Sequence, residues 1–259
     1  MSAFKTAYRF CIHFLTARNT KGFGIHSPFV FNFVQYVLYE KHPYYVFQKI
    51  EEVRKSLLSN HNLINVTDLG AGKSRLRKVS DIASKSLKRK KYAQLLFRIG
   101  HYFKAQNILE LGTSFGITTA YLASVSSTSK VVTLEGCTET LKIAGNNFRK
   151  LGFDNVQMIE GNIDTTLFST LDNFDKLDFV FIDANHRNEA LISYFEQCLR
   201  KIHKTSVIVI DDINWSEGML QAWEKIKLHN RVTSTIDLFE LGIVFFNSDL
   251  VKKHYKIRY

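Results

Sequence analysis

From residue 106 onward, short apolar runs alternate with longer amphipathic stretches, and this rhythm limits the possible folds more than any other feature. The runs are rich in Val, Ile, Leu and Phe and occupy residues 107–112, 130–136, 155–161, 177–183 and 206–212. Such runs are typical of strands buried on both faces of a parallel sheet. Helical patterns separate them, at residues 117–126, 138–151, 188–202 and 215–229. The alternation predicts an α/β protein with a doubly wound, Rossmann-like sheet.

The last part of this region breaks the rhythm. Residues 231–247 contain two strand-like runs around a tight turn near residues 240–242, with no helix between them. An antiparallel hairpin at the end of the sheet is the simplest explanation. We therefore expect a mostly parallel, seven-stranded sheet that ends in a C-terminal antiparallel hairpin.

The N-terminal region lacks strand-like runs and has helical patterns at residues 27–41, 44–60 and 91–103. Ser27 and Pro28 suit the N-cap and first position of a helix. We predict a helical cap region over residues 1–91 and a catalytic domain over residues 92–259. The aromatic side chains of the cap predict a lid over the sheet.

Composition favours a cytoplasmic protein. No apolar run approaches the ~20 residues of a membrane-spanning helix, and the apolar stretch at residues 9–17 is too short for a signal peptide. The three cysteines, Cys11, Cys137 and Cys198, are widely spaced. They predict reduced thiols in the core rather than disulfides.

The formal net charge is +11, and basic residues gather at residues 73–91 and 252–259. Clusters of this kind attract phosphates and anionic surfaces. They are also common on the solvated face of a helix. Both readings stay open for residues 73–91.

Two glycine turns compete for a nucleotide. In the first, Gly72 and Ser74 flank a lysine, as in a phosphate-binding loop, but Thr67 stands where that loop requires a glycine. A polar, basic run follows it instead of a second apolar strand. We therefore reject this turn as the cofactor site.

The second turn fits a nucleotide site. A strand ends at Glu110, Gly112 and Gly116 follow, and the chain enters a helix. The next strand ends in Glu135, whose carboxylate can accept both hydroxyls of a ribose. Asn162 follows the third strand and is expected to face an adenine. Parallel strands end at one edge of a sheet, where such folds bind ligands.

The residues of this turn resemble a known family. "ELGTSFG" (110–116) resembles the first motif of class I S-adenosylmethionine-dependent methyltransferases, with Ser114 in place of the middle glycine. Glu135 matches the family's ribose-binding acid, and the terminal hairpin matches its antiparallel seventh strand. The resemblance covers residues 106–247 and implies S-adenosylmethionine as cofactor. The cofactor-binding residues that it implies are Glu110, Gly112, Thr113, Ser114, Gly116, Glu135, Gly136, Asn162 and Asp183.

Acidic residues follow two later strands. Asp183, Asp211 and Asp212 are expected to converge at the strand ends, where three carboxylates repel unless a cation joins them. Three oxygen ligands suit Mg²⁺. The alternative is that one aspartate contacts the cofactor and another caps a helix.

The same segment is similar to catechol and caffeoyl-coenzyme-A O-methyltransferases. By that resemblance, Asp183, Asp211 and Asp212 fall on metal-ligand positions and His186 on the position of a general-base lysine. Asp212 replaces the usual Asn. A histidine can serve as the base because it titrates near neutrality. Asp183 and His186 are thus the expected catalytic residues.

These observations predict a methyltransferase that acts on a small-molecule hydroxyl, with metal assistance as an option. Two alternatives remain: a nucleic-acid methyltransferase that uses the basic segment, and a non-catalytic cofactor-binding module. A homodimer is compatible with each of them.

Overall fold

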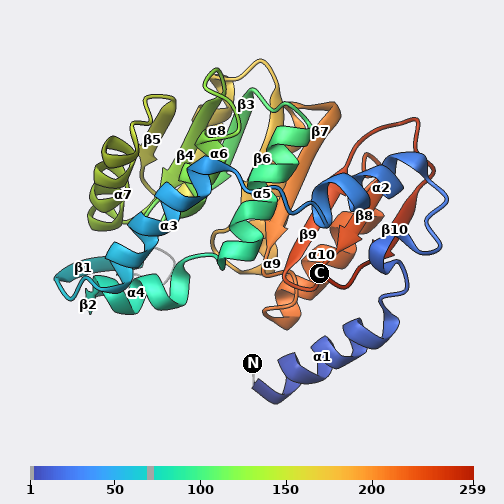
Figure 1. Ribbon diagram of the computed structural model, residues 1–259, viewed down its shortest axis with the longest axis horizontal. Coiled ribbons are helices and arrows are strands. Elements are labelled where there is room, and N and C mark those ends of the chain that lie inside the picture. Colours follow the sequence, from blue (N-terminus) through green and yellow to red (C-terminus); the bar gives the residue numbers. More distant parts are fainter. Residues whose placement is uncertain (1–2, 69–72) are drawn as a thin grey trace. The chain divides into compact units, whose positions relative to one another are not determined.

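The structure is a computed structural model that describes residues 3–68 and 73–259. The chain falls into two compact units, and Figure 1 labels the helices and strands of both. Unit 1 comprises Met1–Glu40 and Asn173–Tyr259, and unit 2 comprises Lys41–Asp172. The region predicted as one helical cap is thus shared between the two units.

Unit 2 contains three parallel strands in the order β3-β4-β5. They span Asn107–Leu111, Lys130–Glu135 and Val156–Glu160. The helices α6 (Ile117–Ala123), α7 (Thr138–Leu151) and α8 (Ile163–Asp172) follow the respective strands. The strand–helix alternation is the one that the apolar runs predicted, although α8 was missed because its sequence is rich in Thr and Ser.

The first part of unit 2 is helical, with one exception. It contains helices α3 (Tyr45–Leu58), α4 (Val79–Ser86) and α5 (Lys90–Tyr102), and a short antiparallel pair, β1 (Leu63–Asp68) and β2 (Lys73–Lys78), lies between α3 and α4 in the sequence. The rejected phosphate loop falls on this pair, and residues 69–72, with Gly72, lie outside the described residues. A strand leads out of the turn, where a phosphate-binding loop requires a helix. The strands before and after residues 69–72 therefore support the rejection of this segment as a phosphate-binding loop.

Unit 1 contains the remaining strands in the order β6-β7-β9-β8-β10. Strands β6 (Leu177–Ile182) and β7 (Ile202–Asp211) are parallel and are linked by α9 (Asn188–Leu199). After α10 (Glu217–Leu228), β8 (Ser234–Asp237) and β9 (Leu241–Phe245) form the predicted antiparallel hairpin. The α/β fold with a mostly parallel sheet and an antiparallel C-terminal hairpin is thus confirmed.

One strand of unit 1 was not predicted. β10 (Lys253–Lys256) pairs in parallel with β8, so β8 lies between β9 and β10 and the hairpin does not form the edge. The sequence of β10 is almost entirely basic, and only Tyr255 is buried within it. Such a short, charged strand is common at sheet edges, where charge discourages further pairing.

The N-terminal part of unit 1 consists of α1 (Ala3–Thr16), a 3₁₀ turn η1 (Thr20–Gly22), α2 (Pro28–Phe33) and a π-helical turn η2 (Val34–Leu38). Ser27 caps α2 as predicted, because its Oγ accepts a hydrogen bond from the N–H of Val30. Phe29 and Phe33 each meet Phe245 of β9 edge-on. Aromatic packing therefore attaches these helices to the C-terminal hairpin.

Two expectations about individual side chains need correction. Met219 and Trp223 are buried on α10, but Trp215, which falls within the helix expected at residues 215–229, precedes the observed helix and is exposed. Cys137 and Cys198 are buried thiols as expected, whereas Cys11 is exposed.

Within the described residues, no helix has the length and apolar character to cross a membrane.

Candidate functional site

The predicted cofactor turn, residues 112–116 in unit 2, is fastened to the end of the neighbouring strand β4. The N–H groups of Gly112 and Thr113 donate to the carbonyl of Leu134, at 3.0 and 3.2 Å. The Ser114 N–H donates to Oε2 of Glu135, at 2.8 Å. The glycine turn and the proposed ribose acid are therefore neighbours, as the sequence analysis required.

Glu135 keeps capacity for a ligand. Its Oε2 accepts from Ser114 N–H, and its Oε1 accepts from Cys137 N–H at 2.9 Å. The side chain is only partly buried. A carboxylate has about four lone-pair sites, so two backbone bonds orient this group and leave oxygen sites for hydroxyls.

The turn depends on unusual backbone angles. Gly112, Ser114 and Gly116 have φ values of +103°, +48° and +75°. A non-glycine residue rarely adopts a positive φ, so Ser114 holds a conformation for which glycine is the easiest choice. This explains why a glycine is typical of the middle position in the motif that the sequence resembles.

Helix α7 packs against the cofactor turn and holds it in place. A Cβ atom at Gly116 would lie 2.5 Å from Cζ of Phe148 and 3.1 Å from Cβ of Ala144. Asn147 donates from Nδ2 to the carbonyl of Phe115 at 2.9 Å. Gly116 therefore allows close packing of α6 on α7, and the buried Asn147 is a supporting residue that the sequence did not reveal.

Glu110 is fully buried at the end of β3. Its Oε2 accepts hydrogen bonds from Thr119 and Thr133, the second at 2.7 Å, and Thr133 also lies 2.6 Å from the hydroxyl of Thr113. This polar cluster joins β3, β4 and α6 beneath the turn. The two threonines escaped the sequence analysis because each sits inside an otherwise apolar element.

Asn162 lies at the end of β5 and caps the following helix. Its Oδ1 accepts from Asp164 N–H at 3.0 Å, and its carbonyl accepts from the N–H groups of Thr165 and Thr166. The preceding Gly161 N–H donates to the carbonyl of Glu135 at 2.9 Å. Asn162 and the partly buried Gly136 thus belong to the same edge of unit 2 as Glu135.

In unit 1, Asp183 and His186 form a pair at the end of β6. His186 Nε2 lies 3.8 Å from Asp183 Oδ1, and both side chains are partly exposed. Between them, Asn185 has a φ of +49° and donates from Nδ2 to the hydroxyl of Tyr194 at 3.2 Å. The His186 ring also faces Trp215, with ring centroids 6.5 Å apart. The acid–histidine pair therefore lies beside an exposed indole.

The predicted metal centre is not formed. Asp211 is almost fully buried at the end of β7, while the next residue, Asp212, is partly exposed with a φ of +52°. In the part of the chain that the structure describes, no group of three or more His, Cys, Asp or Glu side chains is placed to hold a metal ion. Asp183, Asp211 and Asp212 therefore do not fit a shared Mg²⁺ as they stand.

The basic segment of unit 2 runs along β2, α4 and the start of α5. Most of its described cationic side chains are exposed, and burial together with Arg89 and Arg98 lowers the pKa of Lys91. Cys137 at the start of α7 accepts a hydrogen bond from Thr67 N–H through its Sγ at 3.4 Å. The β1–β2 pair is thereby anchored next to the edge of unit 2 that carries the cofactor turn.

Part of the chain is similar to known methyltransferases. Residues 109–213 match a family model described as a methyltransferase domain. This segment includes every residue predicted for the cofactor, the base and the metal. A search of curated proteins finds no match.

Solved structures of several methyltransferases share the fold. An O-methyltransferase from Bacillus cereus in complex with S-adenosylhomocysteine is 23% identical, with a TM-score of 0.54, covering 83% of this chain and 96% of its own. An O-methyltransferase from Streptomyces achromogenes involved in tomaymycin synthesis, in complex with S-adenosylmethionine, is 17% identical, with a TM-score of 0.59 and coverage of 85% and 95%.

A methyltransferase from Podospora anserina with bound S-adenosylhomocysteine is 15% identical, with a TM-score of 0.56 and coverage of 80% and 98%. At these identities the likeness concerns the fold. Together with the family match, it shows that the chain has the fold of methyltransferases and that residues 109–213 are similar to a methyltransferase domain.

Proposed function

We propose that the protein transfers a methyl group from S-adenosylmethionine to a hydroxyl of a small molecule. The observation that carries the proposal is the bond between Ser114 N–H and Glu135, which joins the glycine turn to an acid suited to a ribose. S-adenosylmethionine supplies a methyl group on a sulfonium; the hydroxyl oxygen bonds to that carbon while the carbon–sulfur electron pair leaves on sulfur.

The residues of unit 2 bind and orient the cofactor in this proposal. Glu135 accepts the ribose hydroxyls, and Gly112 permits close approach of the backbone because it has no side chain. Gly116 and Asn147 hold the turn against α7. Glu110 and its two threonines keep the end of β3 in place beneath it.

The residues of unit 1 handle the proton. His186 Nε2 accepts the proton of the acceptor hydroxyl, and the carboxylate of Asp183 stabilises the imidazolium that results. General-base catalysis of this kind contributes about 10²–10⁴-fold to a rate. We assign no step to a metal, because the three aspartates are not arranged as a ligand set.

A matched pair of variants tests the base. His203 Nε2 also pairs with an aspartate, Asp178, at 3.0 Å, but at the other end of the same two strands. His186→Gln should lower kcat about 10²–10⁴-fold with unchanged affinity for S-adenosylhomocysteine, whereas His203→Gln should keep full turnover. An acceptor from a screen of phenols, sugars and lipids provides the assay. Equal turnover in both variants would remove His186 from the mechanism.

A nucleic-acid acceptor is the second candidate. It is supported by the exposed basic side chains of β2, α4 and α5, among them Arg75, Lys85 and Lys90. Binding to phosphates releases counterions, so affinity for RNA should fall steeply with salt. This candidate is excluded if RNA does not bind at physiological salt. It is also excluded if bound RNA competes with neither S-adenosylhomocysteine nor the acceptor.

A further inference from the structure

Helix α1 of unit 1 differs from an ordinary surface helix in the side that it turns toward the protein. An amphipathic helix normally turns its apolar stripe toward the core. Here the side that faces the protein carries the partly buried Arg9 and the buried His13, with Phe10 packed edge-on against Phe239, while Tyr8, Cys11, Ile12 and Leu15 are exposed. The apolar side of α1 is therefore available to something outside this unit.

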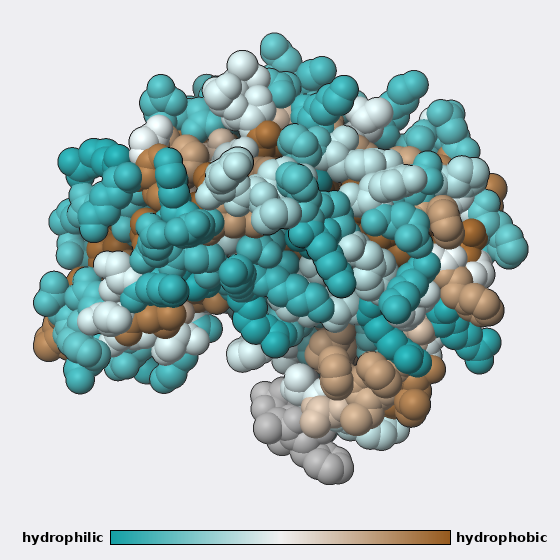
Figure 2. Space-filling model, in the orientation of Figure 1, coloured by the Kyte–Doolittle hydropathy of each residue, from teal (hydrophilic) through white to brown (hydrophobic). Residues whose placement is uncertain are grey.

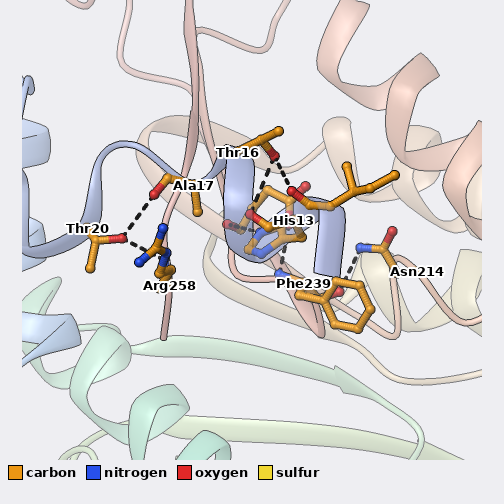
Figure 3. A network of polar contacts seen from close by, with 9 residues as sticks. His13, Thr16, Ala17, Thr20, Asn214, Phe239 and Arg258 are labelled. Atoms are coloured by element: carbon orange, nitrogen blue, oxygen red, sulfur yellow. Dashed lines mark hydrogen bonds and ion pairs between the residues drawn. The ribbon is translucent and has the colours of Figure 1, made fainter. Parts of the chain in front are cut away.

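Polar contacts fix this orientation. Arg9 forms an ion pair with Glu217 at the start of α10, and His13 Nε2 lies 3.1 Å from Oδ1 of Asp237 at the end of β8. Figure 3 shows His13 beside Phe239, whose carbonyl accepts from Asn214 at 2.8 Å. Because these contacts are specific, the helix cannot simply roll over to bury its apolar side.

The exposed stripe follows helical spacing. Tyr8, Cys11, Ile12 and Leu15 lie at i, i+3, i+4 and i+7, and Tyr8, Ile12 and Leu15 are 61%, 40% and 74% exposed. Figure 2 shows the hydrophobic side chains gathered over α1. The stripe runs from Tyr8 to Leu15 of α1, so it extends over about 10 Å along the helix axis. Contiguous apolar surfaces of this kind mark sites of interaction with a protein or a membrane.

Positive charge surrounds the same helix. The first 39 residues contain no Asp or Glu, and Arg18 and Lys21 follow the end of α1. The C-terminal tail adds Lys256 and Arg258: the Lys256 carbonyl accepts from Asn19 N–H at 3.4 Å, and Arg258 Nε donates to the Phe14 carbonyl at 2.7 Å. Figure 3 shows Arg258 near Thr20. All four of these basic side chains are exposed.

We infer that α1 is an interfacial helix that docks the protein on an anionic lipid surface. The stripe of Tyr8, Cys11, Ile12 and Leu15 enters the boundary between headgroups and acyl chains, and Arg18, Lys21, Lys256 and Arg258 contact the anionic headgroups. A helix that combines an apolar face with flanking Lys and Arg binds such surfaces through buried apolar area and electrostatic attraction.

A second copy of the chain is a poorer occupant. Joining two α1 stripes would bring two basic clusters together, and like charges across an interface oppose association. The acids nearest to the helix, Glu217 and Asp237, already pair with Arg9 and His13. Anionic lipid supplies the complementary charge that a copy of this chain lacks at this place.

The test is co-sedimentation of the full chain with vesicles of phosphatidylcholine, with and without phosphatidylglycerol. We expect binding to the anionic vesicles, weaker binding to the neutral ones, and loss of binding as salt is raised. Leu15→Gln should weaken binding roughly tenfold, as expected for a leucine that leaves an apolar environment. The matched control is Leu228→Gln at the end of α10, where Leu228 is 75% exposed and lies outside the stripe; it should bind as the wild type does.

A charge-matched pair completes the design. Arg18→Gln with Lys21→Gln should reduce binding to anionic vesicles more than Arg200→Gln with Lys204→Gln, which removes the same charge elsewhere in unit 1. All four variants alter exposed side chains, and circular dichroism verifies their folding. Absence of vesicle binding, or equal binding by Leu15→Gln and Leu228→Gln, overturns the inference. So does self-association in sedimentation velocity that Leu15→Gln abolishes, because the stripe would then belong to a second copy.

Discussion

The substitution Gly116→Ala tests whether the cofactor turn is held by its packing against α7. Gly116 has a φ of +75°, and a Cβ atom there would lie 2.5 and 2.6 Å from two ring atoms of Phe148. Gly152, at the end of α7, has nearly the same φ, +74°, but nothing lies within 4 Å of its added Cβ. The two positions therefore share the backbone strain and differ in the steric clash.

The expected costs follow from this difference. A left-handed conformation costs a non-glycine residue about 1–2 kcal/mol, and this is the whole cost expected for Gly152→Ala. Overpacking adds about 1–3 kcal/mol, so Gly116→Ala should lose about 2–5 kcal/mol in total. Only Gly116→Ala should also weaken S-adenosylhomocysteine binding, because only Gly116 belongs to the cofactor turn.

Thermal unfolding by circular dichroism measures the two variants side by side. Each kcal/mol lost from the free energy of unfolding lowers Tm by about 2–4 °C in a protein of this size class. Phe148→Leu removes the clashing ring, so Gly116→Ala combined with Phe148→Leu should cost less than the sum of the two single changes. Equal Tm values for Gly116→Ala and Gly152→Ala, or strictly additive costs, would refute the packing argument.

Three further predictions concern other parts of the chain. Tyr121→Phe should cost about 1.5–3 kcal/mol in thermal unfolding, because it removes the buried hydroxyl that donates to Oε1 of Glu51 at 2.8 Å; a loss under 0.5 kcal/mol would contradict this. A thiol reagent should label one of the three cysteines in the native protein, the exposed Cys11, since Cys137 is buried and burial raises the pKa of Cys198 to about 12; mass spectrometry of labelled peptides identifies the site. Turnover should be unchanged by EDTA, because the aspartates after β6 and β7 are not grouped as metal ligands; inhibition that Mg²⁺ reverses would restore the metal hypothesis.

The sequence predicted the elements whose side chains are uniformly apolar. Strands β3, β4, β6, β7 and β9 are largely buried and rich in Val, Ile, Leu and Phe, so their composition identifies them. β5 was identified by its apolar residues, although the structure leaves it mostly exposed rather than buried on both faces. β2 and β10 were missed because their sequences, "KSRLRK" and "KHYK", carry the charge of exposed edges. Their strand conformation comes from pairing with β1 and β8, which local composition does not encode.

The site residues also divide into those that the sequence could predict and those that it could not. The Gly112 turn and Glu135 could be predicted because spacing and backbone requirements act along the chain. The three-aspartate metal centre could not be judged, since convergence depends on the direction of each side chain, and the φ of +52° at Asp212 is invisible in the sequence. The supporting role of Asn147 is likewise a consequence of how α7 packs.

Calorimetric titration of the full chain with S-adenosylhomocysteine tests the central claim most directly. We predict saturable binding at one site, weakened at least tenfold by Glu135→Gln, whose amide can no longer accept from both backbone N–H groups and the ribose hydroxyls. Binding to the wild-type protein that Glu135→Gln leaves unchanged would place the nucleoside elsewhere. Absence of any binding would contradict the assignment of a cofactor site to this turn.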